Sequence, residues 1–206
     1  MHGWGFDASF WKPLAAHLPG RRMAFDDRGY FGAPRHQRPG EPCVVVAHSF
    51  GAMRALAAPP PDCRGMVAIN GFDRFTAIAD AAGVSPRIVE RMIARFDSDP
   101  AAVLSDFRRR CGEDEPFGPA DIDRLRGDLL ELRHGDCAAG AALFPAPILS
   151  LHGARDPLLP APMREIAFAA APLLERTTHP DGGHLLPATD AAYCARAIQA
   201  FAEHMA

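Results

Sequence analysis

The stretch VVVAHSFGA, residues 44–52, decides the fold of this chain. Its β-branched apolar start, Val44–Val46, indicates a buried strand. The small residue Ala47 follows, then Ser49 with a glycine two positions later, and then a helix-favouring run at 52–58. Such a strand–turn–helix holds the serine backbone in a strained conformation and pushes its Oγ out above the sheet. The usual pattern is G-x-S-x-G, and Ala47 stands here in the place of the first glycine.

The helix that begins directly behind Ser49 gives this turn an electrostatic property. The positive end of the helix dipole stabilises negative charge that develops next to the serine. Taken alone, the same residues also fit an ordinary strand-to-helix turn that happens to contain a serine. The remainder of the chain therefore has to distinguish a reactive serine from an incidental one.

The composition limits the class of protein. The 206 residues are enough for one well-filled domain, and 48% apolar with 23% charged residues is typical of a globular protein. The formal net charge of −3 favours neither nucleic acid nor an anionic membrane surface as a partner. No segment combines a basic start with an apolar core as a signal peptide does, and no apolar run reaches about 18 residues. We therefore expect a soluble cytoplasmic protein.

The cysteines lead to the same expectation. They are odd in number, scattered along the chain, and form no CxxC or mixed Cys/His spacing of the kind that binds zinc. Scattered cysteines of this kind indicate reduced thiols in the cytosol. We expect neither a metal site nor disulfides from Cys43, Cys63, Cys111, Cys137 and Cys194.

A glycine-rich stretch around an aromatic residue, His2-Gly3-Trp4-Gly5, lies near the N-terminus. At the end of a strand, such a stretch leaves backbone N–H groups free to point at one spot, which can hold an oxyanion. In this sequence only Met1 precedes the motif, so the strand that normally leads into it is absent. We therefore expect the N-terminal strands to be truncated, with the true start upstream of Met1 or the strand lost. A flexible glycine-rich N-terminus is the alternative.

The remaining chain alternates strands with helices, which is typical of a parallel α/β sheet. We therefore expect a mostly parallel sheet that is flanked by helices. Besides the strand of the opening stretch, we predict strands at 22–26, 65–70, 147–152 and 174–178, and helices at 8–18, 163–171 and 189–204.

The strand signal disappears between 72 and 140. Ser85-Pro86 and Asp99-Pro100 both indicate helix starts, because a capping residue precedes a proline of the first turn. Apolar residues then recur at helical spacing in three successive runs. We therefore predict a helical cap, 72–140, inserted into an α/β core that is formed by 1–71 and 141–206.

Three polar residues follow predicted strands in the order Ser49, Asp156 and His184. Loops at the carboxyl ends of parallel strands converge on one crevice, so we expect these side chains to meet. Serine is a weak nucleophile at neutral pH and needs a base within hydrogen-bond reach. That base in turn needs an acid that holds its tautomer and stabilises its cation. The order serine, acid, histidine is that of the α/β hydrolases.

Other residues compete for the roles of base and acid. Asp181 is close to His184 in the sequence, but it lacks the Asp-Pro loop that begins at Asp156, so Asp156 is the preferred acid. We expect structural or surface roles for His48, which packs beside the serine, and for His152 and His179.

Over nearly its whole length the chain resembles the α/β-hydrolase superfamily. The matching motifs are HGWG at 2–5, AHSFG at 47–51, HGARDP at 152–157 and GH at 183–184, in the order expected for that fold. The resemblance implies an α/β-hydrolase fold and an enzyme that needs no cofactor. It implies that Ser49 is the nucleophile, Asp156 the acid and His184 the base, and that the N–H groups of Trp4 and Phe50 form the oxyanion hole.

Within the superfamily the chain is most similar to the pimeloyl-[acyl-carrier-protein] methyl ester esterases of biotin synthesis, through HGWG at 2–5, a small helical cap and a compact size. In that family an aromatic-led segment of the cap contacts the acyl chain. The corresponding segment here, 107–111, is less apolar than the family pattern. The resemblance implies substrate contacts from Trp4, Ser49, Phe50, Phe107, Cys111 and His184.

Those esterases also use arginines of the cap to hold an acidic carrier protein. In this chain Arg87, Arg91 and Arg95 are spaced at i, i+4 and i+8, on one stripe of a predicted helix. Guanidinium groups suit phosphate and carboxylate partners. The stripe also fits an ordinary solvated helix face, because the predicted cap as a whole has more acidic than basic residues.

The resemblance thus implies a serine carboxylesterase that cleaves a carboxylic ester through an acyl-enzyme. Its expected substrate is a pimeloyl-[acyl-carrier-protein] methyl ester, and its expected partner is an acyl carrier protein. A broad short-chain esterase, or a carbon–carbon bond hydrolase with the same three residues, is a second interpretation. A non-catalytic module that binds a ligand in the same pocket is a third.

Overall fold

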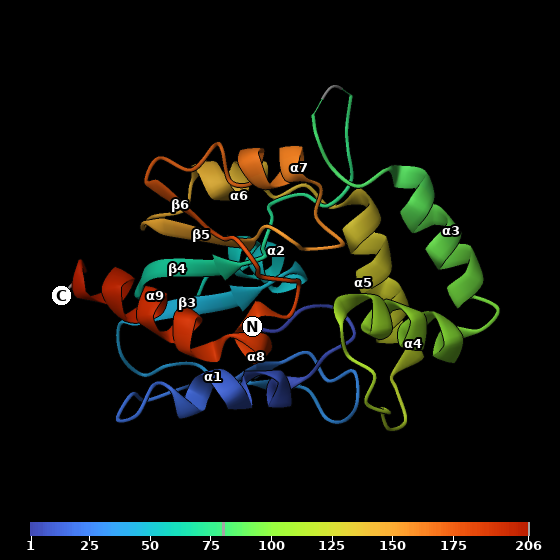
Figure 1. Ribbon diagram of the computed structural model, residues 1–206, viewed down its shortest axis with the longest axis horizontal. Coiled ribbons are helices and arrows are strands. Elements are labelled where there is room, and N and C mark those ends of the chain that lie inside the picture. The colour runs from blue at the N-terminus through green and yellow to red at the C-terminus, as the bar shows by residue number, and fades with distance from the viewer. Residues whose placement is uncertain (80, 206) are drawn as a thin grey trace.

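The computed structural model describes residues 1–79 and 81–205. Its central sheet has four parallel strands in the order β3-β4-β5-β6 (Figure 1). The strands β3, β4 and β5 lie at apolar runs and β6 lies at the predicted position 174–178, and the parallel pairing confirms the predicted α/β class. The strands are β3 Cys43–His48, β4 Cys63–Ile69, β5 Ile148–Gly153 and β6 Leu174–His179.

Helices cover both faces of this sheet, because successive side chains of a strand point to opposite faces. Val67 and Ile69 of β4 pack on one face, and Met66 and Ala68 pack on the other. The first face is covered by the 3-10 helix η1 Ala8–Trp11, α1 Lys12–Ala16, α8 Leu186–Thr189 and α9 Ala191–Glu203, and the second by α2 Phe50–Ala57, α6 Ala138–Ala142 and the segment after α7 Ala161–Ile166. Figure 1 shows α1 and α6 on opposite sides of the sheet.

The strand predicted at 22–26 is wrong. The structure instead has two short strands outside the main sheet, β1 Asp26–Asp27 and β2 Arg35–His36, which pair antiparallel. The residues at 22–24 are exposed, so this segment has no apolar face to bury on a sheet. Asp26 is held by polar partners, since Arg54 Nη2 donates to it at 2.5 Å and His36 Nδ1 lies 2.7 Å from its other oxygen.

The helix predicted at 163–171 has different bounds. It is α7, which begins at Ala161 and ends at Ile166. Two residues later Phe168 has a φ of 58°, a left-handed conformation through which a helix cannot continue. The Phe168 side chain is fully buried against the sheet, and this burial offsets the cost of the strained backbone. The helices predicted at 8–18 and 189–204 are confirmed as η1 with α1, and as α9.

Three helices between β4 and β5 lie together beyond the carboxyl end of the sheet (Figure 1). They bury one apolar cluster that also contains Trp4 and Phe50 of the two candidate oxyanion segments. The helix predicted to begin at Ser85-Pro86 does begin at Pro86, although the Ser85 side chain makes no capping hydrogen bond. We call these the cap helices: α3 Pro86–Phe96, α4 Pro100–Cys111 and α5 Ile122–His134.

Helix α5 is fastened to the N-terminal third of the chain by buried polar contacts. Arg28 donates from Nε and Nη2 to the two carboxylate oxygens of Asp128, each at 2.7 Å, and the Tyr30 hydroxyl donates to Asp128 at 2.6 Å. The Trp4 indole N–H donates to the carbonyl of Leu125 at 2.8 Å. Burial, together with the Asp128 carboxylate, raises the pKa of Tyr30 well above its ordinary value. These contacts place α5 directly against the loop that carries Trp4.

Asp128→Ala is expected to lower the free energy of unfolding by about 3 kcal/mol, because it leaves Arg28 and Tyr30 without their carboxylate partner in a mostly buried site. Urea denaturation followed by circular dichroism measures the change. The matched control is Asp97→Ala, which removes an exposed partner of Arg126 and is expected to change the urea midpoint little. Equal losses in the two variants would contradict an anchoring role for Asp128.

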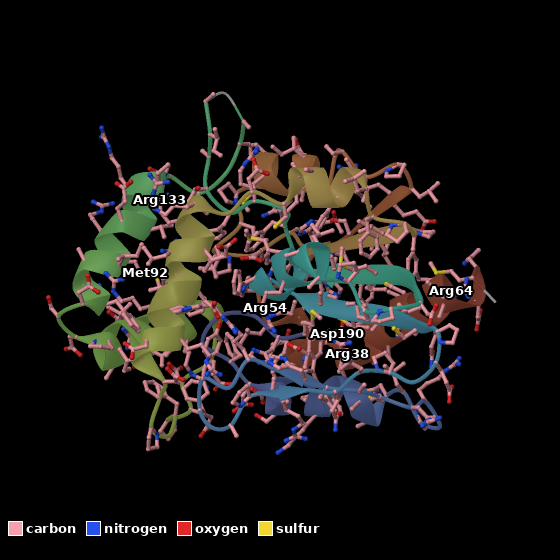
Figure 2. All side chains as sticks on the ribbon, turned by 180° about the vertical axis from the view of Figure 1, so that it is seen from behind. Arg38, Arg54, Arg64, Met92, Arg133 and Asp190 are labelled. Carbon is pink, nitrogen blue, oxygen red and sulfur yellow. The ribbon has the colours of Figure 1, made fainter. Side chains whose placement is uncertain are left out.

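On its outer side α5 is joined to α3 by charge. Arg133 of α5 pairs with Glu90 of α3 at 2.5 Å. Figure 2 shows Arg133 near the end of these two helices and Met92 farther along α3.

Within residues 1–79 and 81–205, none of the helices has both the length and the apolar character needed to cross a membrane.

Candidate active site

Ser49 occupies the predicted turn between β3 and α2. Its φ of 53° and ψ of −126° are sterically costly for a residue with a side chain, as predicted for this strand–turn–helix. The Ser49 N–H donates to the carbonyl of Ile69 at 3.1 Å, which holds the turn to β4. A Cβ on Gly51 would lie 2.5 Å from the Met1 carbonyl oxygen, and one on Gly3 would lie 3.0 Å from the Ser49 Cβ. Small residues are therefore required where these two segments pass each other.

His184 and Asp156 meet as predicted from their order in the chain. His184 Nδ1 lies 2.7 Å from Asp156 Oδ2, and both side chains are buried. The other Asp156 oxygen accepts from the backbone N–H groups of Leu158 at 2.7 Å and Leu159 at 3.2 Å. Burial acts to raise the pKa of Asp156, but His184 and the two N–H donors outweigh burial and hold it below its ordinary value. Asp156 is therefore ionised at neutral pH, and a carboxylate there stabilises the protonated form of His184.

The second nitrogen of His184 is available for chemistry. His184 Nε2 is buried and makes no hydrogen bond to any residue in the described ranges 1–79 and 81–205. Because Nδ1 faces an ionised carboxylate, Nδ1 carries the proton in the neutral ring, and Nε2 carries the lone pair. This is the tautomer that accepts a proton from a serine hydroxyl.

The two candidate oxyanion donors lie next to the serine turn. Phe50 is the first residue of α2, so its backbone N–H has no acceptor within the helix. The Trp4 segment is held beside β3, because the Met1 amino group donates to the Val46 carbonyl at 2.8 Å and the His48 N–H donates to the Met1 carbonyl at 3.0 Å. The Trp4 indole packs on Phe107 of α4, with ring centroids 4.8 Å apart.

A cavity of about 530 Å³ opens at Ser49 between the sheet and the cap helices. Of the six predicted substrate contacts, Trp4, Ser49 and Phe107 line this cavity, whereas Phe50, Cys111 and His184 do not. Cys111 is buried in the apolar core of the first sheet face, where burial and the nearby Asp156 raise the pKa of its thiol. The remaining cavity wall is mostly apolar and includes Phe72, Val84, Val89, Met92, Leu129 and Leu158.

The predicted arginine stripe divides in the structure. Arg91 and Arg95 line the mouth of the cavity, whereas Arg87 is exposed on α3 away from it. Arg95 donates to Asp106 of α4 at 2.9 Å, so part of its charge is neutralised. Arg110 also lines the cavity and donates to the Pro157 carbonyl at 3.1 Å, a contact between the cap and the Asp156 loop that sequence reasoning missed.

The competing residues have other partners. Asp181 pairs with Arg155 at 2.5 Å on the surface, so it is Asp156 that contacts His184. His179 lies 3.1 Å from Asp190. His152 Nε2 lies 2.8 Å from the Ser150 hydroxyl, and burial lowers the pKa of His152 to about 4.

Asn70 is a residue of the site that sequence reasoning missed. It follows β4 with a φ of 47°, and its fully buried side chain donates to the Gly183 and His184 carbonyls at 2.9 and 2.8 Å. Its Oδ1 accepts from the Gly153 N–H at 2.8 Å. The only signal in the sequence is an Asn-Gly pair at the end of a strand, which indicates a left-handed residue rather than a role in a site.

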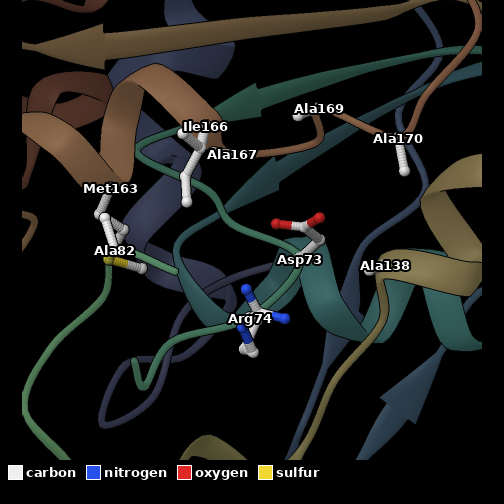
Figure 3. A pocket seen from close by; sticks show the side chains of 9 residues that line it. All are labelled: Asp73, Arg74, Ala82, Ala138, Met163, Ile166, Ala167, Ala169 and Ala170. Carbon is white, nitrogen blue, oxygen red and sulfur yellow. The ribbon is translucent and has the colours of Figure 1, made fainter. Parts of the chain in front are cut away.

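A second, smaller cavity of about 190 Å³ lies near α6 and α7 (Figure 3). Asp73 and Arg74 are its charged residues, and Arg74 also pairs with Asp136 at 2.9 Å. Figure 3 shows the Asp73 and Arg74 side chains among small apolar side chains such as Ala138 and Ala170. None of the residues that line it is a predicted site residue, so the candidate active site is the larger cavity.

Comparison with curated proteins identifies distant homologues over most of the chain, while no family model matches it. The chain is 22% identical over 217 residues to a pimeloyl-[acyl-carrier protein] methyl ester esterase of Yersinia pseudotuberculosis, covering 89% of this chain and 84% of the relative. It is 26% identical over 204 residues to the Serratia marcescens protein of the same name, covering 84% of this chain and 80% of the relative.

Solved structures confirm the α/β-hydrolase fold, with a parallel sheet flanked by helices. An esterase from Exiguobacterium antarcticum superposes with a TM-score of 0.82 at 15% identity, and the match covers 98% of this chain and 90% of the other. A bromoperoxidase from Bacillus anthracis superposes with a TM-score of 0.81 at 17% identity, with the same coverage. Proteins named for different reactions share this fold, so the reaction has to be argued from the site.

Proposed function

We propose that this α/β-hydrolase-fold chain, a distant homologue of carboxylic ester hydrolases, is a serine carboxylesterase with Ser49 as nucleophile, His184 as base and Asp156 as acid. One observation carries the proposal. His184 is held at 2.7 Å by a buried, ionised carboxylate, and its second nitrogen makes no hydrogen bond to a described residue. Its backbone carbonyl lies 2.9 Å from Nε2 of His48, the residue before the strained Ser49. His48 and His152 also leave one ring nitrogen unpaired, but their other nitrogens face a backbone carbonyl and a serine hydroxyl, whereas that of His184 faces a carboxylate.

The arrangement supports an acyl-enzyme route. The Ser49 oxygen attacks the ester carbonyl while His184 Nε2 takes the hydroxyl proton, and the N–H groups of Trp4 and Phe50 stabilise the oxyanion. The intermediate collapses, the carbonyl–alkoxy bond breaks, and His184 returns the proton to the leaving alcohol. Water then attacks the acyl-serine with the same base, which releases the acid and regenerates Ser49. Asp156 stays ionised throughout and stabilises the His184 imidazolium.

Hydrolysis of p-nitrophenyl acetate and butyrate by the purified chain tests this reaction. We expect steady release of nitrophenolate that stops when an organophosphonate modifies one serine, and mass spectrometry is expected to locate the adduct on the peptide that contains Ser49. Activity that survives complete modification of Ser49, or the absence of any turnover, would contradict the proposal.

For the natural substrate, we favour the methyl ester of a pimeloyl chain that is carried by an acyl carrier protein. The curated relatives that match most of this chain have the corresponding name. The mostly apolar wall of the cavity suits an alkyl chain, and its volume of about 530 Å³ is within the range of ordinary ligand pockets. The products would be methanol and the free acid on the carrier. A broad short-chain esterase is the alternative, since several solved structures with this fold are esterases.

Growth of a biotin auxotroph that lacks its own ester-cleaving enzyme separates these two substrates. Expression of this chain is expected to restore growth without biotin if the pimeloyl ester is the substrate. Failure to restore growth by a chain that is folded and cleaves nitrophenyl esters would favour the broad esterase. The proposal places the enzyme in the cytoplasm, which is consistent with five free cysteines.

We take 72–140 as a cap that shapes the substrate cavity, inserted between the two parts of the core, 1–71 and 141–206. Docking of the carrier protein would use the exposed face of α3, where Arg87 and Arg91 make no ion pair with any described residue. Arg95 contributes less to this face, because Asp106 neutralises part of its charge.

Replacing Arg87, Arg91 and Arg95 together by alanine is expected to lower kcat/KM on the carrier-bound ester and to leave a small nitrophenyl ester unaffected. Exposed charges across an interface act on the rate of encounter and are screened over a Debye length of about 8 Å in physiological salt. The difference between wild type and variant should therefore shrink as salt is raised. Stopped-flow or discontinuous assays at low and high salt measure both substrates.

The matched control is a triple alanine variant of Arg21, Arg22 and Arg38, which removes the same charge from exposed positions elsewhere. Figure 2 shows Arg38 well away from Met92 of α3. An equal loss on both substrates in the α3 variant would indicate damaged packing of the cap helices. No loss on either substrate, or an equal loss in the control variant, would show that the stripe is a solvated helix face.

A further inference from the structure

The backbone carbonyl of His184 accepts two hydrogen bonds from buried side chains. His48 Nε2 lies 2.9 Å from it, and Asn70 Nδ2 lies 2.8 Å from it. Both donors are 0% exposed. A carbonyl can accept two hydrogen bonds, one for each lone pair, so this group is fully satisfied and held from two sides.

The two donors come from different strands of the sheet. His48 ends β3 and directly precedes Ser49, whereas Asn70 follows β4. Asn70 also bonds the Gly183 carbonyl and the Gly153 N–H at the end of β5. The loop that carries His184 is thereby tied to the ends of three neighbouring strands, including the strand whose end carries the serine.

The other contacts of the histidine loop leave the His184 carbonyl itself unheld: the Arg155 N–H donates to the Gly182 carbonyl at 2.9 Å, and Asp156 contacts the His184 ring. It contains Gly182-Gly183, which restrict the backbone less than other residues do. The loop also lies very close to β5, since a Cβ on Gly153 would be 2.3 Å from the Gly182 carbonyl oxygen. A small rotation of the His184 peptide would move its ring relative to Ser49.

His48 can hold this carbonyl only when its Nε2 carries a proton. Because Nε2 faces a carbonyl oxygen, Nε2 carries the proton, and Nδ1 makes no hydrogen bond within the described residues. Its ring is packed against Phe10 at 4.5 Å and against His184 at 4.8 Å between centroids. Burial lowers the pKa of His48 well below its ordinary value, and His184, His2 and the Met1 amino group act in the same direction. The hydrogen bond to the His184 carbonyl opposes them. His48 therefore stays neutral beside an imidazole that becomes charged during turnover.

We propose that His48 and Asn70 are positioning residues that together hold the His184 carbonyl, and so fix the distance between the His184 ring and the Ser49 hydroxyl. This inference rests on the proposed function, because it concerns the geometry of the same base and nucleophile. Neither residue exchanges a proton with substrate. His48 is suited to the role because it directly precedes the nucleophile in the chain. Its hydrogen bond therefore links the backbone next to Ser49 to the backbone of the base.

The test compares His48→Leu, which removes the donor, with His48→Gln, whose amide nitrogen can donate from nearly the same place as Nε2. His48→Leu is expected to lower kcat on p-nitrophenyl butyrate by about 100-fold with little change in KM, since a displacement of about 1 Å at a reacting group can cost that much. His48→Gln is expected to recover most of the lost kcat. Asn70→Asp, which keeps the acceptor for Gly153 but loses the donor, is expected to resemble His48→Leu.

His152→Leu is the matched control, because His152 is another buried histidine whose hydrogen bond goes to Ser150 and not to the His184 loop. It is expected to lower the melting temperature about as much as His48→Leu and to leave kcat within a few-fold of wild type. Three results would overturn the inference: full activity of His48→Leu, an equal loss in His48→Gln, or an equal loss of kcat in His152→Leu. A wild-type chain that hydrolyses no ester would contradict the proposed function itself, whereas the three results above concern only the positioning contact.

Discussion

Ser49→Ala is expected to lower kcat for ester hydrolysis by about 10⁶-fold. Removing the nucleophile of a serine–histidine–aspartate site abolishes the acyl-enzyme route, and the remaining rate comes from the oxyanion hole and from binding alone. Here the effect should be large, because the proposed base, His184 Nε2, makes no hydrogen bond to any described residue, and the Phe50 N–H, a proposed oxyanion donor, has no acceptor within its helix. Initial rates on p-nitrophenyl butyrate, with enzyme at high concentration, measure the residual activity.

The same variant is expected to fold normally. The Ser49 side chain makes no hydrogen bond to another described residue, so its loss leaves no buried group unsatisfied. Alanine meets the same backbone strain at a φ of 53° as serine does, so the strain is unchanged. An unchanged melting temperature together with lost turnover would establish a chemical role. Activity close to wild type in the folded variant would remove Ser49 from the mechanism.

Asp156→Asn is expected to lower kcat by about 10⁴-fold. An amide cannot stabilise the His184 cation, and its NH₂ group favours the His184 tautomer in which Nε2 holds the proton and cannot act as base. Combining this change with Ser49→Ala should cost no more than Ser49→Ala alone, because residues that act as a unit are not additive. The control is Asp181→Asn, which removes only a surface partner of Arg155 and should leave kcat nearly unchanged. A larger loss in Asp181→Asn than in Asp156→Asn would show that the acid is misassigned.

The lowered pKa of Asp156 also predicts how the free energy of unfolding depends on pH. Its pKa in the folded chain is below the ordinary value, so the unfolded chain binds a proton more readily than the folded chain. The stability that comes from its contacts is fully present above the unfolded pKa of about 3.9 and is lost as the pH falls through the folded pKa. Urea midpoints measured between pH 3 and pH 6 are expected to fall less steeply with acid in Asp156→Asn than in wild type.

The sequence by itself determined the sheet and the chemistry that it can present. Three apolar runs were sufficient to predict β3, β4 and β5, because a strand buried in a parallel sheet has to be largely apolar. The residues of β6 are half-buried or exposed, and this strand was predicted at 174–178 as the last strand of the alternating α/β pattern. The serine turn was predictable from the spacing of small residues around Ser49, since each close approach requires one. The pairing of His184 with Asp156 rather than Asp181 followed from the Asp-Pro loop and from the convergence of loops at the carboxyl ends of parallel strands.

Only the tertiary structure decided how the pieces between these strands are used. Residues 22–26 have the local composition of a strand, but the structure leaves them no position in the main sheet. Cys111 and Phe107 are four residues apart on α4, yet Phe107 lines the cavity and Cys111 is buried in the core. The division of one helix between two surroundings depends on which elements pack around it, and helical spacing alone does not contain that information.

The contacts of His48 and Asn70 with the His184 carbonyl were likewise beyond sequence reasoning. They join residues 136 and 114 positions apart, and one end of each is a backbone carbonyl, which every residue possesses. A motif can indicate which side chains perform chemistry, because chemistry depends on residue type. The hydrogen bonds that set the distance between those side chains depend on where the backbone passes, and that is decided only when the strands, the cap helices and the histidine loop pack together.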